Sequence, residues 1–245
     1  MRISSFDLSI IASQLEGLEE TIIYRLIDRA QFAQNAEVYR KGESGFPESE
    51  LSLFDLRLYY QEYMDARFGR FMVPEERPYH GNLPNPERSI DPEAFGFPFT
   101  DFNKINLTED IRKAYLKLVP ELCCPGDDGH HGSSVEHDVY PFQAISRRIH
   151  FGAFYVAESK YKNNAEEYTK LITENNREGI IQLLTRKEVE QKILERVSQK
   201  VAYAQKYINT QVRGRISEKA VLSFYRESII PLTKEGEIQY LFNRV

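Results

Sequence analysis

The sequence has only two cysteines among its 245 residues, and they are adjacent, at Cys123 and Cys124. Without partners elsewhere in the chain they cannot staple loops together, so we expect a protein that works in a reducing compartment. No stretch approaches the roughly 18 apolar residues that a membrane span requires, and residues 1–17 lack the long apolar run of a secretory signal. These absences predict a cytoplasmic protein with no transmembrane segment.

An excess of positive charge is also lacking. The formal net charge is -5 at pH 7 and the pI is near 5.7, so no overall field attracts phosphate backbones or anionic lipids. We therefore expect no nucleic-acid partner and no membrane partner, and any cationic site must be local. With 41% hydrophobic residues, a chain of this length can bury a full core without a disulfide or a cofactor.

Apolar residues recur at three- and four-residue steps through most of the chain, which predicts amphipathic helices. No convincing alternation typical of strands occurs. The fold class predicted is all-α, a single domain over residues 1–245 built as a bundle of long packed helices. The predicted helices cover residues 7–32, 50–71, 108–119, 135–161, 165–172, 185–208 and 217–241, with Thr108 as an N-cap.

Two segments interrupt the helical pattern. Six prolines exclude regular helix and strand across residues 72–106, and Phe95, Phe97, Phe99 and Phe102 predict that this segment packs as an ordered wrap. Residues 123–134 contain PGDDGHHGSS, which predicts a loop. Its histidines fit neither a zinc-protease nor a zinc-finger spacing, so we predict no metal site.

Polar residues lie at spacings that direct them into the bundle. The stretch ISRRIHFGAFYVAESKY, residues 145–161, places Arg147 and Arg148 in an apolar helical run and then adds Lys160. A buried cation needs an anionic partner, because burying an unpaired charge is costly. A carboxylate ligand is favoured over a nucleotide, since the arginine fork matches carboxylates and the chain has no glycine-rich phosphate cradle.

Two further pairs stand four residues apart and therefore share a helix face: Thr233 with Glu237, and Arg186 with Glu190. Each pair alone is typical of a solvated helix surface. Together with Arg148 and Lys160 they could instead converge in the bundle interior, where helical folds build their binding sites. Whether the carboxylates satisfy the cations structurally or leave them for a ligand stays open at this point.

Several motifs, in order and over nearly the whole chain, resemble one family. They are LEGLEETIIYRLIDRAQF, GSSVEHD followed by QAISRRIHFG, VAESKY, VEQKILERV and the closing IIPLTKEGEIQYLFNRV. These motifs are similar to those of the eukaryotic-type (yeast and plant) chorismate mutases of the all-helical AroQ class. The resemblance implies a homodimeric isomerase that converts chorismate to prephenate, on the route to phenylalanine and tyrosine, without a cofactor.

The resemblance also implies roles for single residues. Arg148 would clamp a substrate carboxylate, Lys160 would donate to a carboxylate and to the ether oxygen, Glu190 would accept from the ring hydroxyl, and Thr233 would help to fix a carboxylate. Glu237 would donate to the ether oxygen, which a glutamate does only when protonated. We therefore expect a rate that declines as the pH rises above neutral and that Glu237→Gln flattens.

The chain departs from the family at the first helix. Ala12, seven residues before Glu19, stands where relatives carry an arginine that reaches the substrate. Arg186 stands where the yeast enzyme has asparagine, and we hypothesise that it supplies the missing cation. Because of Ala12, a catalytically weak or inactive homologue that binds aromatic amino acids stays open as an alternative function.

Two more departures fall in the helix that carries Arg148. The step of twelve residues to Lys160 is one residue longer than in relatives, which would turn the lysine by about 100°. We predict that a π-bulge between residues 152 and 157 absorbs the extra residue. Pro141 lies where relatives have an ordinary helix former, so we expect a kink or a later helix start.

An effector pocket is also implied by the resemblance. Arg70 matches an arginine that binds the effector carboxylate, and Gly132 and Ser133 match a Gly-Ser pair that binds the amino-acid backbone. Glu136 stands where the yeast enzyme has threonine, and Gly69 replaces one of two arginines. Inhibition by tyrosine and activation by tryptophan are therefore left open.

Overall fold

The computed structural model describes residues 7–47, 49–88, 101–209 and 214–244. Regular structure in these residues is helical and includes no strand, so the predicted all-α class is confirmed. The helices are α1 (Leu8–Arg29), α2 (Leu53–Arg67), α3 (Thr108–Leu122), α4 (His131–Phe151), α5 (Ala157–Asn163), α6 (Ala165–Thr173), α7 (Arg177–Leu184), α8 (Lys187–Gln205), α9 (Glu218–Phe224) and α10 (Ile230–Arg244). Two π-helical turns, η5 (Gly152–Val156) and η6 (Tyr225–Ile229), join consecutive helices, and short 3-10 turns are η1 (Ala36–Tyr39), η2 (Arg70–Met72) and η4 (Phe102–Lys104).

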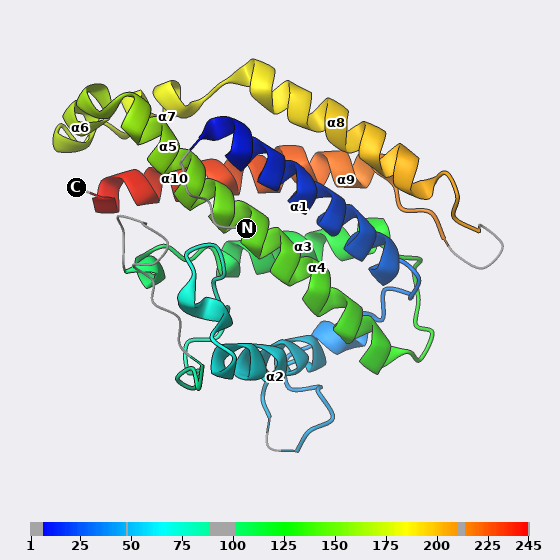
Figure 1. Ribbon diagram of the computed structural model, residues 1–245. Helices are drawn as coiled ribbons and strands as arrows, with labels where there is room; N and C mark the ends of the chain where they lie inside the picture. Colours follow the sequence, from blue (N-terminus) through cyan, green and yellow to red (C-terminus); the bar gives the residue numbers. More distant parts are fainter. Residues whose placement is uncertain (1–6, 48, 89–100, 210–213, 245) are drawn as a thin grey trace.

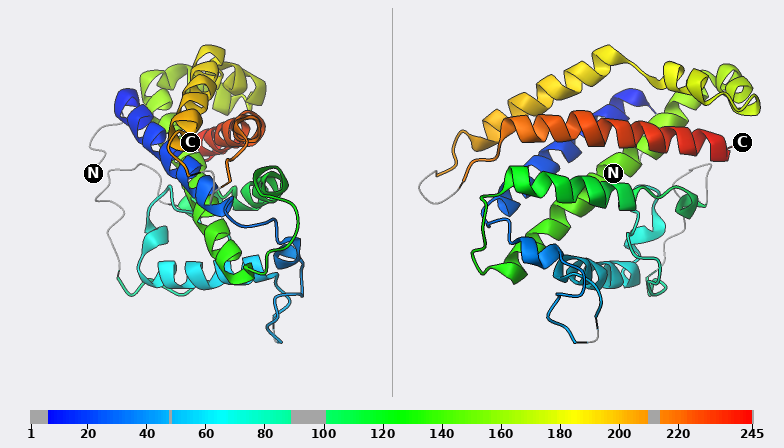
Figure 2. Two further views of the ribbon diagram at one scale, coloured as in Figure 1. Left: turned by 90° about the vertical axis from the view of Figure 1, so that its right-hand side faces the viewer. Right: turned by 180° about the vertical axis from the view of Figure 1, so that it is seen from behind.

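The helices pack side by side in a bundle. α1 and α4 lie along each other, and α2 packs against α4 as well (Figure 1). α9, η6 and α10 form one long rod that α8 accompanies (Figure 2). Apolar side chains fill two clusters, a larger one shared by α1 to α4, α8 and α9 and a smaller one around η5, α6, α7 and α10. No described helix combines the length and the apolar character needed to cross a bilayer.

Helix starts follow local capping chemistry. The carboxylate of Asp7 accepts from the backbone N–H of Ser9 at the start of α1, as the periodicity predicted. α2 is shorter than predicted, because the Ser52 hydroxyl caps it only three residues into the predicted span. The prediction for Thr108 is wrong: it is the first residue of α3, and Asn106 Oδ1 accepts from both its N–H and its hydroxyl.

The start of α4 also differs from the sequence prediction. The helix begins at His131 and continues through Pro141, so the later start is wrong, and Gly132 and Ser133 lie in the first helical turn instead of a loop. Proline removes one backbone hydrogen bond, and buried residues on both sides of it, including Val139 and Phe142, keep the helix packed.

One helix was not predicted, and part of another predicted segment falls outside the described residues. α7 was not predicted; it is only eight residues long and is capped by Asn176, whose side chain accepts from Gly179 N–H. Of the segment 72–106, residues 72–88 and 101–106 contain short 3-10 turns but no α-helix and no strand, as the prolines predicted. Phe95, Phe97 and Phe99 fall outside the described residues.

The π-bulge predicted from the extra residue between Arg148 and Lys160, relative to the family pattern, is present. η5 spans Gly152–Val156, inside the predicted interval, and connects α4 to α5 without a break. A π turn accommodates one extra residue and so shifts the phase of the side chains that follow it. The second π turn, η6, had no counterpart in the sequence prediction.

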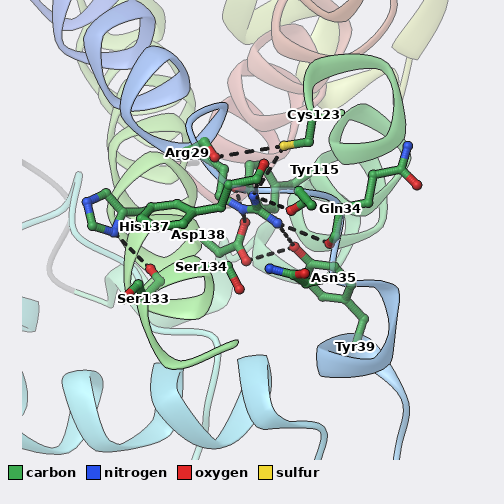
Figure 3. A network of polar contacts seen from close by, with 12 residues as sticks. Arg29, Gln34, Asn35, Tyr39, Tyr115, Cys123, Ser133, Ser134, His137 and Asp138 are labelled. Atoms are coloured by element: carbon green, nitrogen blue, oxygen red, sulfur yellow. Dashed lines mark hydrogen bonds and ion pairs between the residues drawn. The ribbon is translucent and has the colours of Figure 1, made fainter. Parts of the chain in front are cut away.

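A buried polar network fastens α1, α3 and α4 together (Figure 3). Arg29 Nε donates to Asp138 Oδ1 over 2.5 Å, and the hydroxyls of Tyr39 and Tyr115 each donate to the same carboxylate over 2.7 Å. The guanidinium also contacts Cys123 Sγ at 3.2 Å and donates to backbone carbonyls in the turn after α1. Burial alone would lower the pKa of Arg29, but the Asp138 carboxylate, Tyr39, Cys123 and Tyr115 together outweigh it, and the pKa is raised.

A second buried contact makes stability depend on pH. His150 is fully buried; its Nε2 accepts from the backbone N–H of Leu107 over 3.0 Å, and its Nδ1–H donates to the carbonyl of Ser146 over 2.8 Å. Burial lowers the pKa of His150 to about 3. The ring is therefore neutral in the folded protein at any pH above that value.

We expect the folded state to lose stability as the pH falls below about 6.5. In that range the unfolded chain binds a proton at His150, whereas the folded chain does not. Between pH 7 and pH 5 this linkage removes about 2 kcal/mol from the free energy of unfolding. Urea denaturation at both pH values measures it. His150→Gln, whose side-chain oxygen can still accept from Leu107, serves as the control and should lose about 2 kcal/mol less over that interval. Equal losses in the two proteins would show that His150 is not the source.

Candidate active site

All six residues singled out as catalytic line one cavity of about 290 Å³. Its walls come from α1, α4, η5, α5, α7, α8 and α10 and from Arg186, which lies between α7 and α8. A larger open hollow of about 680 Å³ beside α2 has no arginine, lysine or carboxylate among its described lining residues. The residues singled out as catalytic therefore lie at the smaller cavity, which is lined by Leu8, Ile11, Ala12, Leu15, Arg148, Val156, Lys160, Leu184, Arg186, Val189, Glu190, Ile193, Ile230, Thr233, Lys234 and Glu237.

Arg148 is the most deeply placed cation of the cavity, with 2% of its surface exposed. Its Nη1 donates to Thr233 Oγ1 over 3.0 Å, and that hydroxyl in turn donates to the carbonyl of Ile229. It forms no ion pair with any described carboxylate, and burial lowers its pKa because desolvation penalises the charged form. Its neighbour Arg147 instead faces outward, where it pairs with Glu76 at 3.3 Å.

Close packing of α10 on η5 brings Thr233 to Arg148. A Cβ added to Gly152 would lie 2.5 Å from Thr233 Cγ2, and one added to Gly236 would lie 2.5 Å from the Cβ of Ala153. Real Cβ atoms do not approach so closely, so both positions need glycine for this backbone approach. The two glycines thus set the depth at which the Thr233 hydroxyl sits.

Lys160 reaches the same cavity from the far side of the π turn. Its Nζ contacts Glu237 Oε2 at 2.8 Å and donates to the carbonyl of Leu184 over 3.3 Å. Glu237 is 7% exposed and shares the cavity with Thr233, as their four-residue spacing predicted. The shift in helical phase at η5 allows both Arg148 and Lys160 to face the cavity despite the extra residue between them.

The opposite side of the cavity is formed by the start of α8. Arg186 is the N-cap of this helix and not part of it, and its carbonyl accepts from the N–H of Glu190. Its side chain is exposed at the cavity rim, not buried as the sequence argument assumed, and has no ion-pair partner in the described chain. Glu190 Oε1 contacts Lys234 Nζ at 2.9 Å. Sequence reasoning missed Lys234, although its place between Thr233 and Glu237 was a usable signal.

The cavity carries an uneven set of charges. Its described lining includes four cations, Arg148, Lys160, Arg186 and Lys234, and two carboxylates, Glu190 and Glu237. The two lysines are each paired with a carboxylate. Neither arginine is paired with a carboxylate in the part of the chain that the structure describes, which leaves an excess of two positive charges.

The residues matched to an effector pocket are not brought together within one chain. Arg70 pairs with Asp65 at 2.7 Å and Glu76 at 3.0 Å, and its Nη1 also donates to Gln143. Gln143 follows Gly132 by eleven residues in α4, which places it about 16 Å further along the helix axis. Ser133 lies beside Gly132 in the first turn.

Metal ligation has no support in the part of the chain that is described, which contains no group of three or more His, Cys, Asp or Glu side chains placed to hold an ion. His131 instead contacts the Asp127 carboxylate at 2.8 Å, and His137 Nδ1 donates to the carbonyl of Ser133.

No family model matches the chain. The chorismate mutase of Schizosaccharomyces pombe, however, is 37% identical to it over 243 residues, which cover 96% of this chain and 95% of that protein. The chain belongs to the chorismate mutase family. Chorismate mutases are isomerases, and the resemblance seen in the motifs is thereby confirmed.

Solved chorismate mutases share the whole fold. The Candida albicans enzyme in complex with L-Trp superposes with a TM-score of 0.89 at 33% identity, covering 98% of this chain and 92% of that chain. AtCM1 with tyrosine bound in its allosteric site superposes with a TM-score of 0.85 at 31% identity, covering 98% and 97%. The helical bundle described above is therefore the chorismate mutase fold.

Proposed function

We propose that the cavity binds chorismate and rearranges it to prephenate. The observation that carries the proposal is the excess of two positive charges in the cavity, where Arg148 and Arg186 have no carboxylate partner among the described residues. A dianionic dicarboxylate neutralises this excess and offsets the cost of burying the Arg148 charge. The volume of about 290 Å³ is that of a small-molecule site.

The reaction breaks one C–O bond and forms one C–C bond within the same molecule, so it needs neither a nucleophile nor a cofactor. Arg148 and the Thr233 hydroxyl fix one carboxylate and hold the substrate in its compact conformer. Lys160 donates to a carboxylate and to the ether oxygen as negative charge develops there. Glu190 accepts from the ring hydroxyl, and Glu237 lies beside Lys160 to donate to the ether oxygen when it carries a proton.

Loss of chorismate absorbance after addition of purified protein tests the proposal directly. Turnover that saturates with chorismate and yields prephenate is the expected result. Binding of an aromatic amino acid without any turnover would favour the alternative, a catalytically inactive homologue.

The role of Glu237 predicts a pH dependence. Because only a protonated glutamate donates to the ether oxygen, kcat/KM should decline as the pH rises. Glu237→Gln donates at every pH and should flatten the profile. Profiles of equal slope in the two proteins would remove this role from Glu237.

Arg186 is the proposed second carboxylate anchor. Ala12 and Arg186 line the same cavity, so the Arg186 guanidinium at the start of α8 can bind the carboxylate that an arginine at position 12 of α1 would bind. Arg186→Ala should raise KM about tenfold with a smaller change in kcat, as loss of one charge-assisted contact implies. The matched control is Lys187→Ala, its exposed neighbour. The pair Ala12→Arg with Arg186→Ala should recover KM, and an unchanged KM in Arg186→Ala would refute the assignment.

A homodimer is the proposed assembly. α2 and its C-cap expose Tyr60, Tyr63, Met64 and Phe68, spaced so that they lie on one side of the helix. Such an exposed apolar face suits a second copy of the chain. Sedimentation should give a dimer, and Met64→Glu should shift it toward monomer; a monomeric wild-type protein would overturn the proposal.

Aromatic amino acids are the proposed effectors. Gly132 and Ser133 start α4, whereas Arg70 lies about 16 Å away along it, so an effector that touches all three must bridge two chains. Tyrosine should therefore change activity in the dimer and not in a monomeric variant. An equal response in both would place the effector elsewhere.

A reducing, cytoplasmic location fits the network around Cys123, whose thiol contacts Arg29 in the protein interior. Oxidation of that thiol would disturb the buried ion pair beside it. Refolding under mild oxidant should accordingly give a lower yield of active protein than refolding with a reductant.

A further inference from the structure

Lys234 stands at a point of the cavity that the proposed catalytic roles do not use. It follows Thr233 in α10, and its Nζ lies 2.9 Å from Glu190 Oε1 in the first turn of α8. Both side chains are partly shielded, with 25% of Lys234 and 31% of Glu190 exposed. The contact spans the cavity between two helices that otherwise pack on different neighbours.

The carboxylate of Glu190 has one oxygen engaged and one available. In the described chain its Oε1 contacts Lys234, whereas Oε2 has no protein partner. An ionised carboxylate accepts hydrogen bonds through both oxygens. Glu190 is therefore oriented by one oxygen and can receive a hydroxyl at the other.

The positive charge of Lys234 also reduces the repulsion between Glu190 and an anionic ligand. A lone carboxylate next to a dianionic ligand would repel it, since like charges a few Å apart interact strongly in a partly desolvated site. The ammonium of Lys234 cancels this repulsion, and the N-terminal end of α8 adds a favourable dipole to the same carboxylate.

We propose that Lys234 is a positioning residue, which orients Glu190 and neutralises it so that the remaining oxygen accepts the ring hydroxyl of a dianionic substrate. This inference rests on the proposed function, because it takes the hydroxyl of chorismate as the group that Glu190 receives. Lys234 acts through Glu190 and does not itself bind the substrate.

A double-mutant cycle separates these roles. The affinity of the bicyclic dicarboxylate that mimics the transition state is measured by calorimetry for the wild type, Lys234→Met, Glu190→Gln and the double variant. Lys234→Met should weaken binding about tenfold or more in the wild-type background and less than about twofold in the Glu190→Gln background. Lys234→Arg should retain most of the affinity, and Lys192→Met, an exposed lysine of the same helix as Glu190, should change nothing.

Equal losses in the two backgrounds would mean that Lys234 binds the ligand directly or acts only on folding, and either result overturns the inference. The cycle uses binding, so it can be completed even when no chorismate is consumed. Failure of the proposed function appears separately, as absence of turnover by the wild-type protein.

Discussion

Arg148→Met is expected to lower kcat/KM by about 10³-fold, the size of effect seen when a preorganised donor to the transition state is removed from a buried site. Arg148 is 2% exposed, donates to Thr233 and has no described carboxylate partner, so a substrate carboxylate is its natural complement. Steady-state kinetics with chorismate measure the loss. A decrease of less than about tenfold would show that Arg148 does not hold the substrate.

For Arg148→Met we also expect an unusually small loss in the free energy of unfolding. Removing a buried cation that has no anionic partner should leave the free energy of unfolding of the ligand-free protein within about 1 kcal/mol of the wild type, or raise it. Arg147→Met is the matched control, because Arg147 is exposed and pairs with Glu76 away from the cavity. It should change kcat/KM by less than about twofold. A strong loss of stability in Arg148→Met would instead assign Arg148 a structural role.

Arg29→Met is expected to destabilise the protein by about 3–5 kcal/mol, because it leaves a buried carboxylate without its cation. Arg29 and Asp138 are both fully buried, and the guanidinium also satisfies carbonyls after α1 (Figure 3). Urea denaturation at pH 7 gives the free energy directly. Since the network lies apart from the residues that line the cavity, kcat/KM of the remaining folded protein should stay close to that of the wild type.

The double variant Arg29→Met with Asp138→Leu provides the control for Arg29. Replacing both partners by apolar groups removes the unpaired charge, so part of the lost stability should return. Additive losses in the double variant would show that the ion pair is not the main cause.

Periodicity was sufficient for the long helices. α1 was predicted from apolar residues such as Ile22 and Leu26, which are indeed fully buried. Boundaries were less accurate, because they depend on single acceptors: Ser52 caps α2 later than predicted, and Asn106 accepts from the N–H of Thr108, which was itself expected to be the cap. α7 was not predicted because its eight residues form about two helical turns, too few for a clear apolar periodicity.

The candidate site was recovered to a similar degree. Arg148, Lys160, Thr233 and Glu237 were found from spacing and motif, and the structure brings them to one cavity. Lys234 was missed because a lysine at that position is typical of an exposed helix face, and only the approach of α8 reveals its partner. Arg186 is at the rim and not in the interior, because α8 begins one residue after it.

The all-helical class followed from the spacing of apolar residues along the chain, and the family and the need for a π turn followed from comparing its motifs and their spacing with those of relatives. Only the tertiary structure decided which charges are compensated. Lysine and glutamate from separate helices pair across the cavity, whereas Arg148 is left with a hydroxyl. The physical reason is that an electrostatic interaction depends on distance and burial in space, which residue spacing along a helix does not specify.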